Sequence, residues 1–210
     1  MGQATDIEGL AGHLLGMAPE GRVICAVAGA PGSGKSTLAE GLVERMNAVE
    51  AGAAALLPMD GFHYDDLHLV PAGLRPRKGA PETFDVGGLR SALRRLRAGD
   101  EESVAVPVFD RAIEIARAGA RLIPRSARAI VCEGNWLLLD RAPWDGLRGL
   151  FDATVMIEVP EAELRRRLRL RWEGFGLSED EIAWKLDGND LPNGRLVAEA
   201  SAAPDWVVRP

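Results

Sequence analysis

Short apolar runs alternate along the chain with longer stretches in which apolar residues recur at helical spacing. Four runs have the length and composition of buried strands. They lie at residues 22–28, 53–59, 129–133 and 153–159. Helical spacing marks four segments: 5–17 with Thr5 as cap, 38–46, 86–98 and 161–173. Strands that alternate with helices predict an α/β fold, with a mainly parallel sheet between two layers of helices.

Other segments are less regular. Residues 62–83 are rich in proline, glycine and charge, which predicts a long loop or irregular excursion. Residues 104–109 have strand character, whereas residues 110–124 show no clear period. A final short strand is predicted at residues 206–208. We find no internal repeat and expect a single domain over residues 1–210.

The amino-acid composition of the chain argues against two classes of binding partner. The hydrophobic fraction is 47%, the charged fraction 27% and the net charge −6. Proteins that bind nucleic acids or membrane surfaces need a basic face, so we expect neither partner. Cys25 and Cys132 lie inside strand-like runs, which predicts buried free thiols and a reducing, cytoplasmic location. We find no targeting signal or bilayer-spanning run, and the sequence leaves a homodimer open.

The stretch GAPGSGKST fits the phosphate-loop pattern G-x-x-x-x-G-K-[ST] completely. It joins the first predicted strand to a helix, whose N-terminus attracts phosphate. Lys35 can reach the β- and γ-phosphates, and the Ser36 hydroxyl can bind Mg²⁺. The alternative is a flexible turn with a chance lysine. We predict a nucleoside triphosphate site made of Gly29, Ala30, Pro31, Gly32, Ser33, Gly34, Lys35, Ser36 and Thr37.

Parallel sheets bind ligands at the carboxyl ends of their strands, so residues that follow strands are candidates for chemistry. Asp60 follows the second strand, where a carboxylate can accept the proton of an attacking hydroxyl. The alternative is an aspartate that forms a turn before Gly61. The aromatic and ionisable cluster at residues 62–66 favours a small-molecule pocket.

Glu133 follows a third strand and is predicted to hold Mg²⁺, together with Ser36, or to orient the substrate. The segment 161–173 carries five arginines. Most arginines on helices are solvated, and we favour Arg167 and Arg171, which lie four residues apart, as catalytic groups that close over the transferring phosphoryl group.

Two kinds of side chain compete for the acceptor. Hydrogen-bonding groups suited to a sugar include His63, Arg111, Glu133 and Asn135. Aromatic faces suited to a nucleobase are Phe62, Phe109 and Trp136. His63 has the alternative of being a satisfied polar residue in a loop. The crowding of polar groups favours a sugar or small polyol.

Six segments together resemble the phosphoribulokinase/uridine kinase family, and they span nearly the whole chain. They are GAPGSGKST, MDGFHYDD, GAPETFDV, VPVFDR, VCEGNWLLLD and NDLPNGRLV. Within the family the chain is most similar to the bacterial branch named for fructose transport system kinases, and more distantly to bacterial pantothenate kinases.

The resemblance implies a three-layer α/β/α P-loop kinase fold with an arginine-rich lid, and ATP-dependent phosphorylation of a hydroxyl. It also implies that Asp60 is the catalytic aspartate and that Arg167 and Arg171 belong to the lid. By the same resemblance Arg111 lies near the acceptor. Two asparagines, Asn189 and Asn193, are implied to lie near the nucleotide base.

Three functions remain open at this point. The leading one is an ATP- and Mg²⁺-dependent kinase for a sugar, a nucleoside such as uridine or cytidine, or a pantothenate-like alcohol. A P-loop hydrolase or switch would need no acceptor, and a regulatory protein would bind nucleotide without catalysis. Intact Lys35, Ser36, Asp60 and Glu133 favour the kinase.

Overall fold

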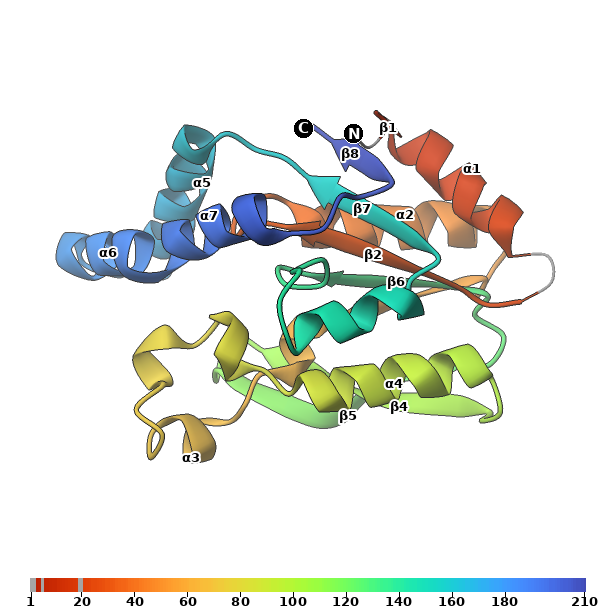
Figure 1. Ribbon diagram of the computed structural model, residues 1–210, viewed down its shortest axis with the longest axis horizontal. Coiled ribbons are helices and arrows are strands. Elements are labelled where there is room, and N and C mark those ends of the chain that lie inside the picture. Colours follow the sequence, from red (N-terminus) through yellow and green to blue (C-terminus); the bar gives the residue numbers. More distant parts are fainter. Residues whose placement is uncertain (1–2, 5, 19–20) are drawn as a thin grey trace.

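A six-stranded sheet, parallel throughout, runs through the centre of the molecule (Figure 1). The computed structural model describes residues 3–4, 6–18 and 21–210. The strand order is β1-β8-β7-β2-β6-β3. The strands are β1 (Gln3–Ala4), β2 (Val23–Gly29), β3 (Ala54–Pro58), β6 (Ala129–Gly134), β7 (Ala153–Ile157) and β8 (Trp206–Val208).

Strands β2 and β6 are neighbours inside the sheet, and every residue in both is buried. Strands covered on both faces read as continuous apolar runs, which is why the sequence reveals them. Ala28 is paired with Gly134, and Gly29 with Ile157, so β2, β6 and β7 all end at the same edge of the sheet. That edge carries the phosphate loop.

Helices cover both faces of the sheet, as the α/β/α prediction requires (Figure 1). On one face α1 (Ile7–Met17) and α2 (Lys35–Val49) form a core around Leu14, Leu42 and Met46. On the other face α4 (Val86–Ala98) packs with the 3₁₀ turn Trp144–Leu150.

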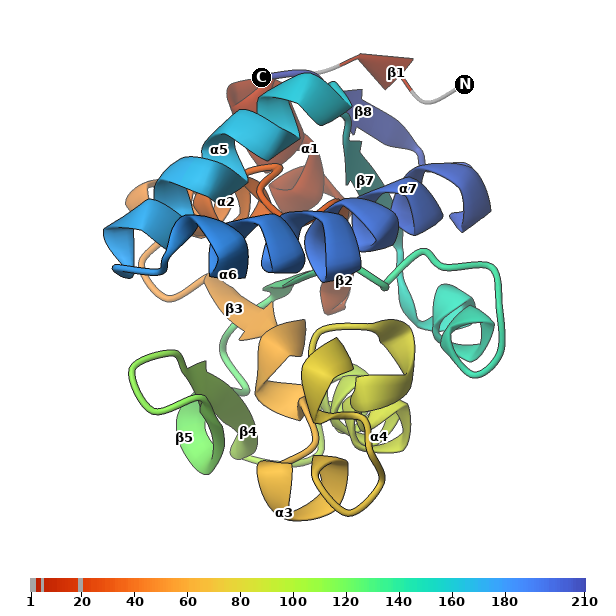
Figure 2. The same cartoon turned by 90° about the vertical axis from the view of Figure 1, so that its left-hand side faces the viewer.

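A third group of helices lies beyond the carboxyl ends of the strands (Figure 2). It consists of α5 (Glu161–Gly174), α6 (Glu179–Lys185), a π-helical turn (Leu186–Asp190) and α7 (Leu191–Ala200). Leu164, Leu168 and Ile182 form its own small core. The arginine-rich segment of the sequence is therefore a helix placed over the binding edge of the sheet.

Several element boundaries follow local capping. The α4 helix spans the predicted residues 86–98, because the Asp85 side chain accepts a hydrogen bond from Gly88 N and Gly99 ends the helix at φ 66°. The α1 helix is capped by Asp6, which accepts from Gly9 N. The predicted cap, Thr5, lies outside the described residues.

Two predictions of irregular structure need correction. Residues 62–83 contain a short helix, α3 (Asp66–Leu69), and 3₁₀ turns. Residues 110–124 contain β5 (Ile115–Pro124), which pairs antiparallel with β4 (Ser103–Asp110) in a separate two-stranded sheet. Most of β5 is solvent-exposed, so its sequence lacks the apolar alternation of a half-buried strand.

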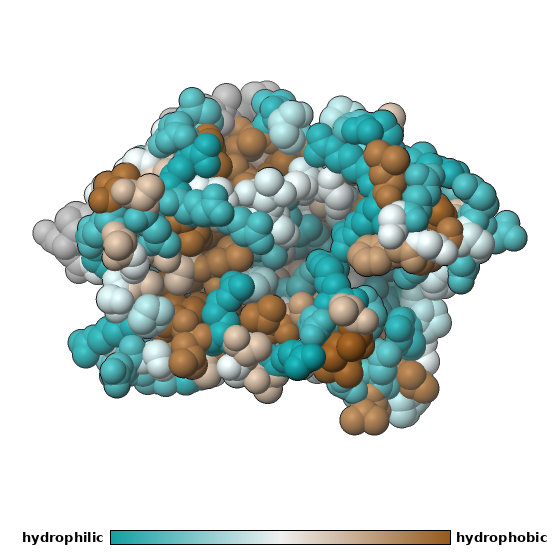
Figure 3. Space-filling model, turned by 180° about the vertical axis from the view of Figure 1, so that it is seen from behind, coloured by the Kyte–Doolittle hydropathy of each residue, from teal (hydrophilic) through white to brown (hydrophobic). Residues whose placement is uncertain are grey.

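Both cysteines are free and fully buried, as predicted. Burial raises the pKa of the Cys25 thiol to about 12, so this thiol is unreactive at neutral pH. On the face seen from behind, hydrophobic residues form several separate patches among hydrophilic ones (Figure 3). Within the described ranges no helix combines the length and the apolar character needed to cross a bilayer.

Candidate active site

The phosphate loop turns from β2 into α2 through two glycines with positive φ. Gly32 has φ 78°, and Gly34, which is the N-cap of α2, has φ 91°. Residues with a side chain rarely adopt this backbone conformation, and a Cβ on Gly32 would also lie 2.9 Å from Cγ of Leu168. The loop therefore needs glycine both for its curvature and for its contact with α5.

The loop contains hydrogen-bond donors that suit a phosphate group. The Ser33 hydroxyl is buried and has no hydrogen-bond partner within the described part of the chain. Nη1 of Arg167 donates to the carbonyl oxygen of Ser33 at 3.4 Å, so one predicted lid arginine already reaches the loop. Backbone N–H groups at the start of α2 add further donors.

Ser36 and Glu133 come together, although they are far apart in the sequence. The Ser36 hydroxyl, in the first turn of α2, donates to Oε2 of Glu133 at the end of β6 over 3.2 Å. Burial, followed by the negative charge of Asp60, raises the pKa of Glu133 to about 7. A hydroxyl and a carboxylate are ligands that Mg²⁺ accepts, so this pair fits the predicted metal site.

Lys35 lies among these carboxylates. Burial lowers the pKa of its ammonium group, while the charges of Glu133 and Asp60 act in the opposite direction. The arrangement places one cation between the predicted metal ligand and the predicted base.

Asp60 lies in the 3₁₀ turn Met59–Phe62 directly after β3. Its Oδ2 accepts a hydrogen bond from Nη2 of Arg111 at 2.6 Å. Burial alone would raise the pKa of Asp60, but the positive charges of Arg111 and Lys35 hold it below its ordinary value. The carboxylate is therefore ionised at neutral pH, as a general base must be.

The His63 ring has a defined orientation next to this carboxylate. Its Nδ1 lies 2.8 Å from the carbonyl oxygen of Asp60, which can only accept, so Nδ1 carries the hydrogen. In the neutral ring Nε2 is then an acceptor, and burial lowers the His63 pKa and favours this form. The ring packs against Phe84 and Phe109, with centroid distances of 4.0 and 4.8 Å.

The side chains of Lys35, Asp60, His63 and Arg111 line one cavity of about 160 Å³ between the sheet edge, the lid helices and the segment around residues 75–84. Ser36, Glu133 and Arg167 do not line it, whereas nine of the predicted site residues do. They are Pro31, Lys35, Asp60, His63, Arg111, Asn135, Arg171, Asn189 and Asn193. Asn189 and Asn193 line the same cavity as Asp60. Their predicted role at the nucleotide base stays a prediction.

Two predicted substrate contacts are corrected. Phe62 is 7% exposed and Trp136 is 0% exposed, and both belong to the hydrophobic core. Trp136 instead donates from Nε1 to the carbonyl oxygen of Gly79 at 3.0 Å. An aromatic residue after a strand is as suitable for the core as for a ligand, and the sequence does not distinguish the two.

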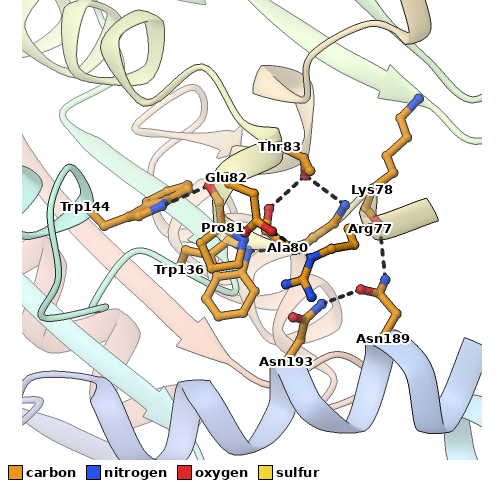
Figure 4. A network of polar contacts seen from close by, with 11 residues as sticks. Arg77, Lys78, Ala80, Pro81, Glu82, Thr83, Trp136, Trp144, Asn189 and Asn193 are labelled. Carbon is orange, nitrogen blue, oxygen red and sulfur yellow. Dashed lines mark hydrogen bonds and ion pairs between the residues drawn. The ribbon is translucent and has the colours of Figure 1, made fainter. Parts of the chain in front are cut away.

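The segment 77–83 is held in place by a network of polar contacts (Figure 4). Besides Trp136, Trp144 donates to the carbonyl oxygen of Pro81, and Asn189 donates to that of Lys78. Asn193 in turn donates to Oδ1 of Asn189 at 3.1 Å. The network fixes one wall of the cavity to the helices of the opposite wall.

Several residues that line the cavity were missed from the sequence. They are Arg75, Lys78, Phe84, Glu114, Trp172, Trp184, Lys185 and Asp190. Most lie in segments predicted to be irregular or left unassigned. The motif GAPETFDV, which contributes to the family resemblance, was the one signal that pointed to this wall.

Gly61 couples the Asp60 turn to the β4–β5 hairpin. A Cβ at this position would lie 2.2 Å from the carbonyl oxygen of Pro107. We expect Gly61→Ala to lower the free energy of unfolding by about 1–3 kcal/mol, because the hairpin must move away. Gly12→Ala is the matched control: position 12 is helical with no atom within 4 Å, and alanine should stabilise by about 0.5–1 kcal/mol. Urea unfolding measures both, and equal stability of the two variants would contradict the coupling.

A phosphate loop, an ionised carboxylate and an arginine-bearing lid at the carboxyl edge of a parallel sheet define a P-loop kinase fold. No protein-family profile matches the chain. A Schizosaccharomyces pombe protein provisionally named a uridine kinase, C227.14, is 32% identical over 195 residues, covering 90% of this chain and 83% of that protein. Escherichia coli YggC is 36% identical over 193 residues, covering 90% and 78%.

Solved structures of similar proteins have the same fold. A provisionally named fructose transport system kinase from Silicibacter sp. TM1040 is 41% identical with a TM-score of 0.89, over 97% of this chain and 99% of that chain. YFH7 from Saccharomyces cerevisiae shares the fold, with a TM-score of 0.82 at 20% identity, over 98% of this chain and 99% of that chain. The chain belongs to the phosphoribulokinase/uridine kinase family of P-loop kinases.

Proposed function

We propose that the protein transfers the γ-phosphate of ATP to a hydroxyl of a small sugar or polyol. The observation that carries the proposal is the ionised Asp60 carboxylate, which lies in the same cavity as Lys35 and is held by Arg111 at 2.6 Å. A purely regulatory protein has no need of a base, and a hydrolase has no need of an acceptor cavity beside that base. A kinase needs both, because the acceptor hydroxyl must lose its proton as it attacks.

Each residue then has a defined task. Lys35 and the loop N–H groups bind the phosphates, and Arg167 and Arg171 neutralise the charge that develops on the transferring group. Ser36 and Glu133 would hold Mg²⁺, which supplies positive charge to the phosphate oxygens when bound. Asp60 accepts the hydroxyl proton, and Arg111 orients the carboxylate through Oδ2.

The aromatic side chains favour a sugar over a nucleoside. Of the three predicted stacking residues only Phe109 lines the cavity, and His63 already packs on it. On the lid, the Nζ of Lys185 lies 4.5 Å from the ring centroid of Trp172, so a cation already packs on that ring. Trp184, which is 54% exposed, keeps the nucleoside alternative open.

The names of similar proteins support a small-molecule acceptor without selecting one. They include the uridine kinase name of the S. pombe relative and the fructose transport system kinase name of the bacterial structure. Pantothenate kinase of Nocardioides sp. is 30% identical over 169 residues, which are 75% of this chain and 51% of that protein. A pantothenate-like alcohol therefore remains the other alternative.

The test is a screen of purified protein with Mg²⁺-ATP and a metabolite pool, following both ADP release and the phosphorylated product. We expect a sugar or polyol to be the most efficient acceptor. If uridine, cytidine or pantothenate exceeds every sugar by about a hundredfold in kcat/KM, the sugar proposal is wrong and the kinase proposal stands. ADP release without any phosphorylated product would instead identify a hydrolase.

A further inference from the structure

The cavity is rich in positive charge in a chain whose net charge is −6. Six cationic side chains line it: Lys35, Arg75, Lys78, Arg111, Arg171 and Lys185. Three carboxylates line it: Asp60, Glu114 and Asp190. Burial raises the pKa of Asp190, whose Oδ2 accepts a hydrogen bond from Nε1 of Trp172 at 2.8 Å.

The cations fall into two groups with different tasks. Lys35 belongs to the phosphate loop and Arg171 to the lid helix α5, so both are suited to the triphosphate. Arg75, Lys78 and Arg111 lie on the other wall, which is formed by the 3₁₀ turn Arg75–Arg77, the residues after it and the end of β4. Figure 2 shows the segment around α3 across from the lid helices.

Lys78 and Arg111 converge on the ring of Phe109. The Lys78 Nζ is 5.4 Å and the Arg111 Cζ 6.0 Å from its centroid. The Lys78 side chain is 6% exposed, yet it lines the cavity. Lysines buried to this extent are almost always paired, and Lys78 is paired with Asp66 at 2.8 Å.

The cations of this wall use part of their hydrogen-bonding capacity within the protein, and the Lys78 Nζ donates to the backbone carbonyl oxygen of Glu114 at 2.8 Å. Arg75 and Lys78 share a single carboxylate, Asp66, at 2.6 and 2.8 Å. Arg111 uses Nη2 on Asp60, and a guanidinium has five N–H donors. Donors and positive charge therefore remain for a ligand at this wall.

Two hydrogen-bond acceptors lie in the same cavity. Oδ1 of Asn135 is buried and lacks a hydrogen-bond partner among the described residues. Nε2 of His63 is an acceptor because Nδ1 bonds to the Asp60 carbonyl. Acceptors of this kind suit the hydroxyls of a polyol, whereas the cationic wall suits an anion.

We propose that the acceptor is a polyol that carries an anionic group, either a carboxylate or a phosphate monoester, bound by Arg111, Lys78 and Arg75. The inference rests on the proposed kinase function and deepens it. The anion anchors one end of the acceptor, and its hydroxyl is presented to Asp60. Charge-assisted hydrogen bonds to such a group are worth about 1.5–3 kcal/mol, which corresponds to roughly tenfold to a hundredfold in kcat/KM.

The test compares matched acceptors with saturating Mg²⁺-ATP, following the phosphorylated product. One pair is gluconate and glucitol, the other fructose 6-phosphate and fructose. We expect the charged member of at least one pair to have the higher kcat/KM by about tenfold or more. The two pairs separate a carboxylate from a phosphate. Binding is followed separately as the shift in Tm with the nucleotide site filled by a non-hydrolysable ATP analogue.

Variants locate the anion site. Lys78→Met and Arg75→Gln should each lower the charged-to-neutral ratio of kcat/KM about tenfold. Arg77→Gln is the matched control, since Arg77 lies on the same segment, is paired with Glu82 and does not line the cavity, so the ratio should not change. Thermal unfolding confirms that each variant is folded.

The outcomes are distinct. Equal or better use of neutral acceptors overturns the anion proposal and leaves the kinase function standing. A charged preference that survives in both Lys78→Met and Arg75→Gln overturns the assigned wall. If none of the four compounds is phosphorylated while the metabolite screen yields a neutral acceptor, the anion proposal fails and the kinase function stands. If the screen yields no phosphorylated product either, both fail.

Discussion

Lys35→Ala should lower the rate of phosphoryl transfer by about 10²–10³-fold, because it removes a positive charge from oxygens that gain charge towards the transition state. The ammonium lies in the substrate cavity with the carboxylates of Asp60 and Glu133 close enough to oppose its pKa shift. Initial rates with the best acceptor measure the effect. Arg94→Ala, which removes an exposed cation from α4, is the matched control and should retain full activity. Near-normal turnover in Lys35→Ala would refute the kinase assignment of the loop.

Asp60→Asn should separate binding from chemistry. The amide keeps the shape of the carboxylate but cannot take up the hydroxyl proton, so transfer should fall by about 10²–10⁴-fold. Mg²⁺-ATP affinity, measured by calorimetry, should change little, since the Ser33 hydroxyl, Lys35 and the loop backbone remain. Asp100→Asn, an exposed carboxylate after α4, controls for the loss of charge. Loss of nucleotide affinity equal to the loss of turnover would place Asp60 among the metal ligands or the structural residues instead.

The sequence predicted those parts of the site that follow from local pattern. The phosphate loop is a contiguous motif. Asp60 follows β3 and Glu133 lies at the end of β6, and both strands are short apolar runs that are easily recognised. The α4 helix is bounded by local signals, an aspartate cap and a left-handed glycine. Where a few neighbouring residues determine the backbone conformation and the burial, the sequence is enough to predict the structure.

The rest depends on contacts between distant segments. Arg111 and Asp60 are 51 residues apart in the sequence, and the hairpin of β4 and β5 brings them together. The sequence does not predict this hairpin, because its exposed strand β5 has no apolar period. The α6 helix has a capping box, Ser178 with Glu181, that could have revealed it. Beyond it, glycine and asparagine in the π-helical turn Leu186–Asp190 resemble a loop. Trp136 shows the converse, since its position after a strand suggested a ligand contact but tertiary packing buries it.

The most direct test of the central claim is the fate of the labelled γ-phosphate of ATP when the protein is incubated with a metabolite pool and Mg²⁺. The geometry of Asp60, Arg111 and Lys35 predicts that the label appears in an organic phosphate ester, and that Asp60→Asn abolishes this product. Label found in inorganic phosphate alone, or retained in ATP, would contradict the assignment of the protein as a small-molecule kinase.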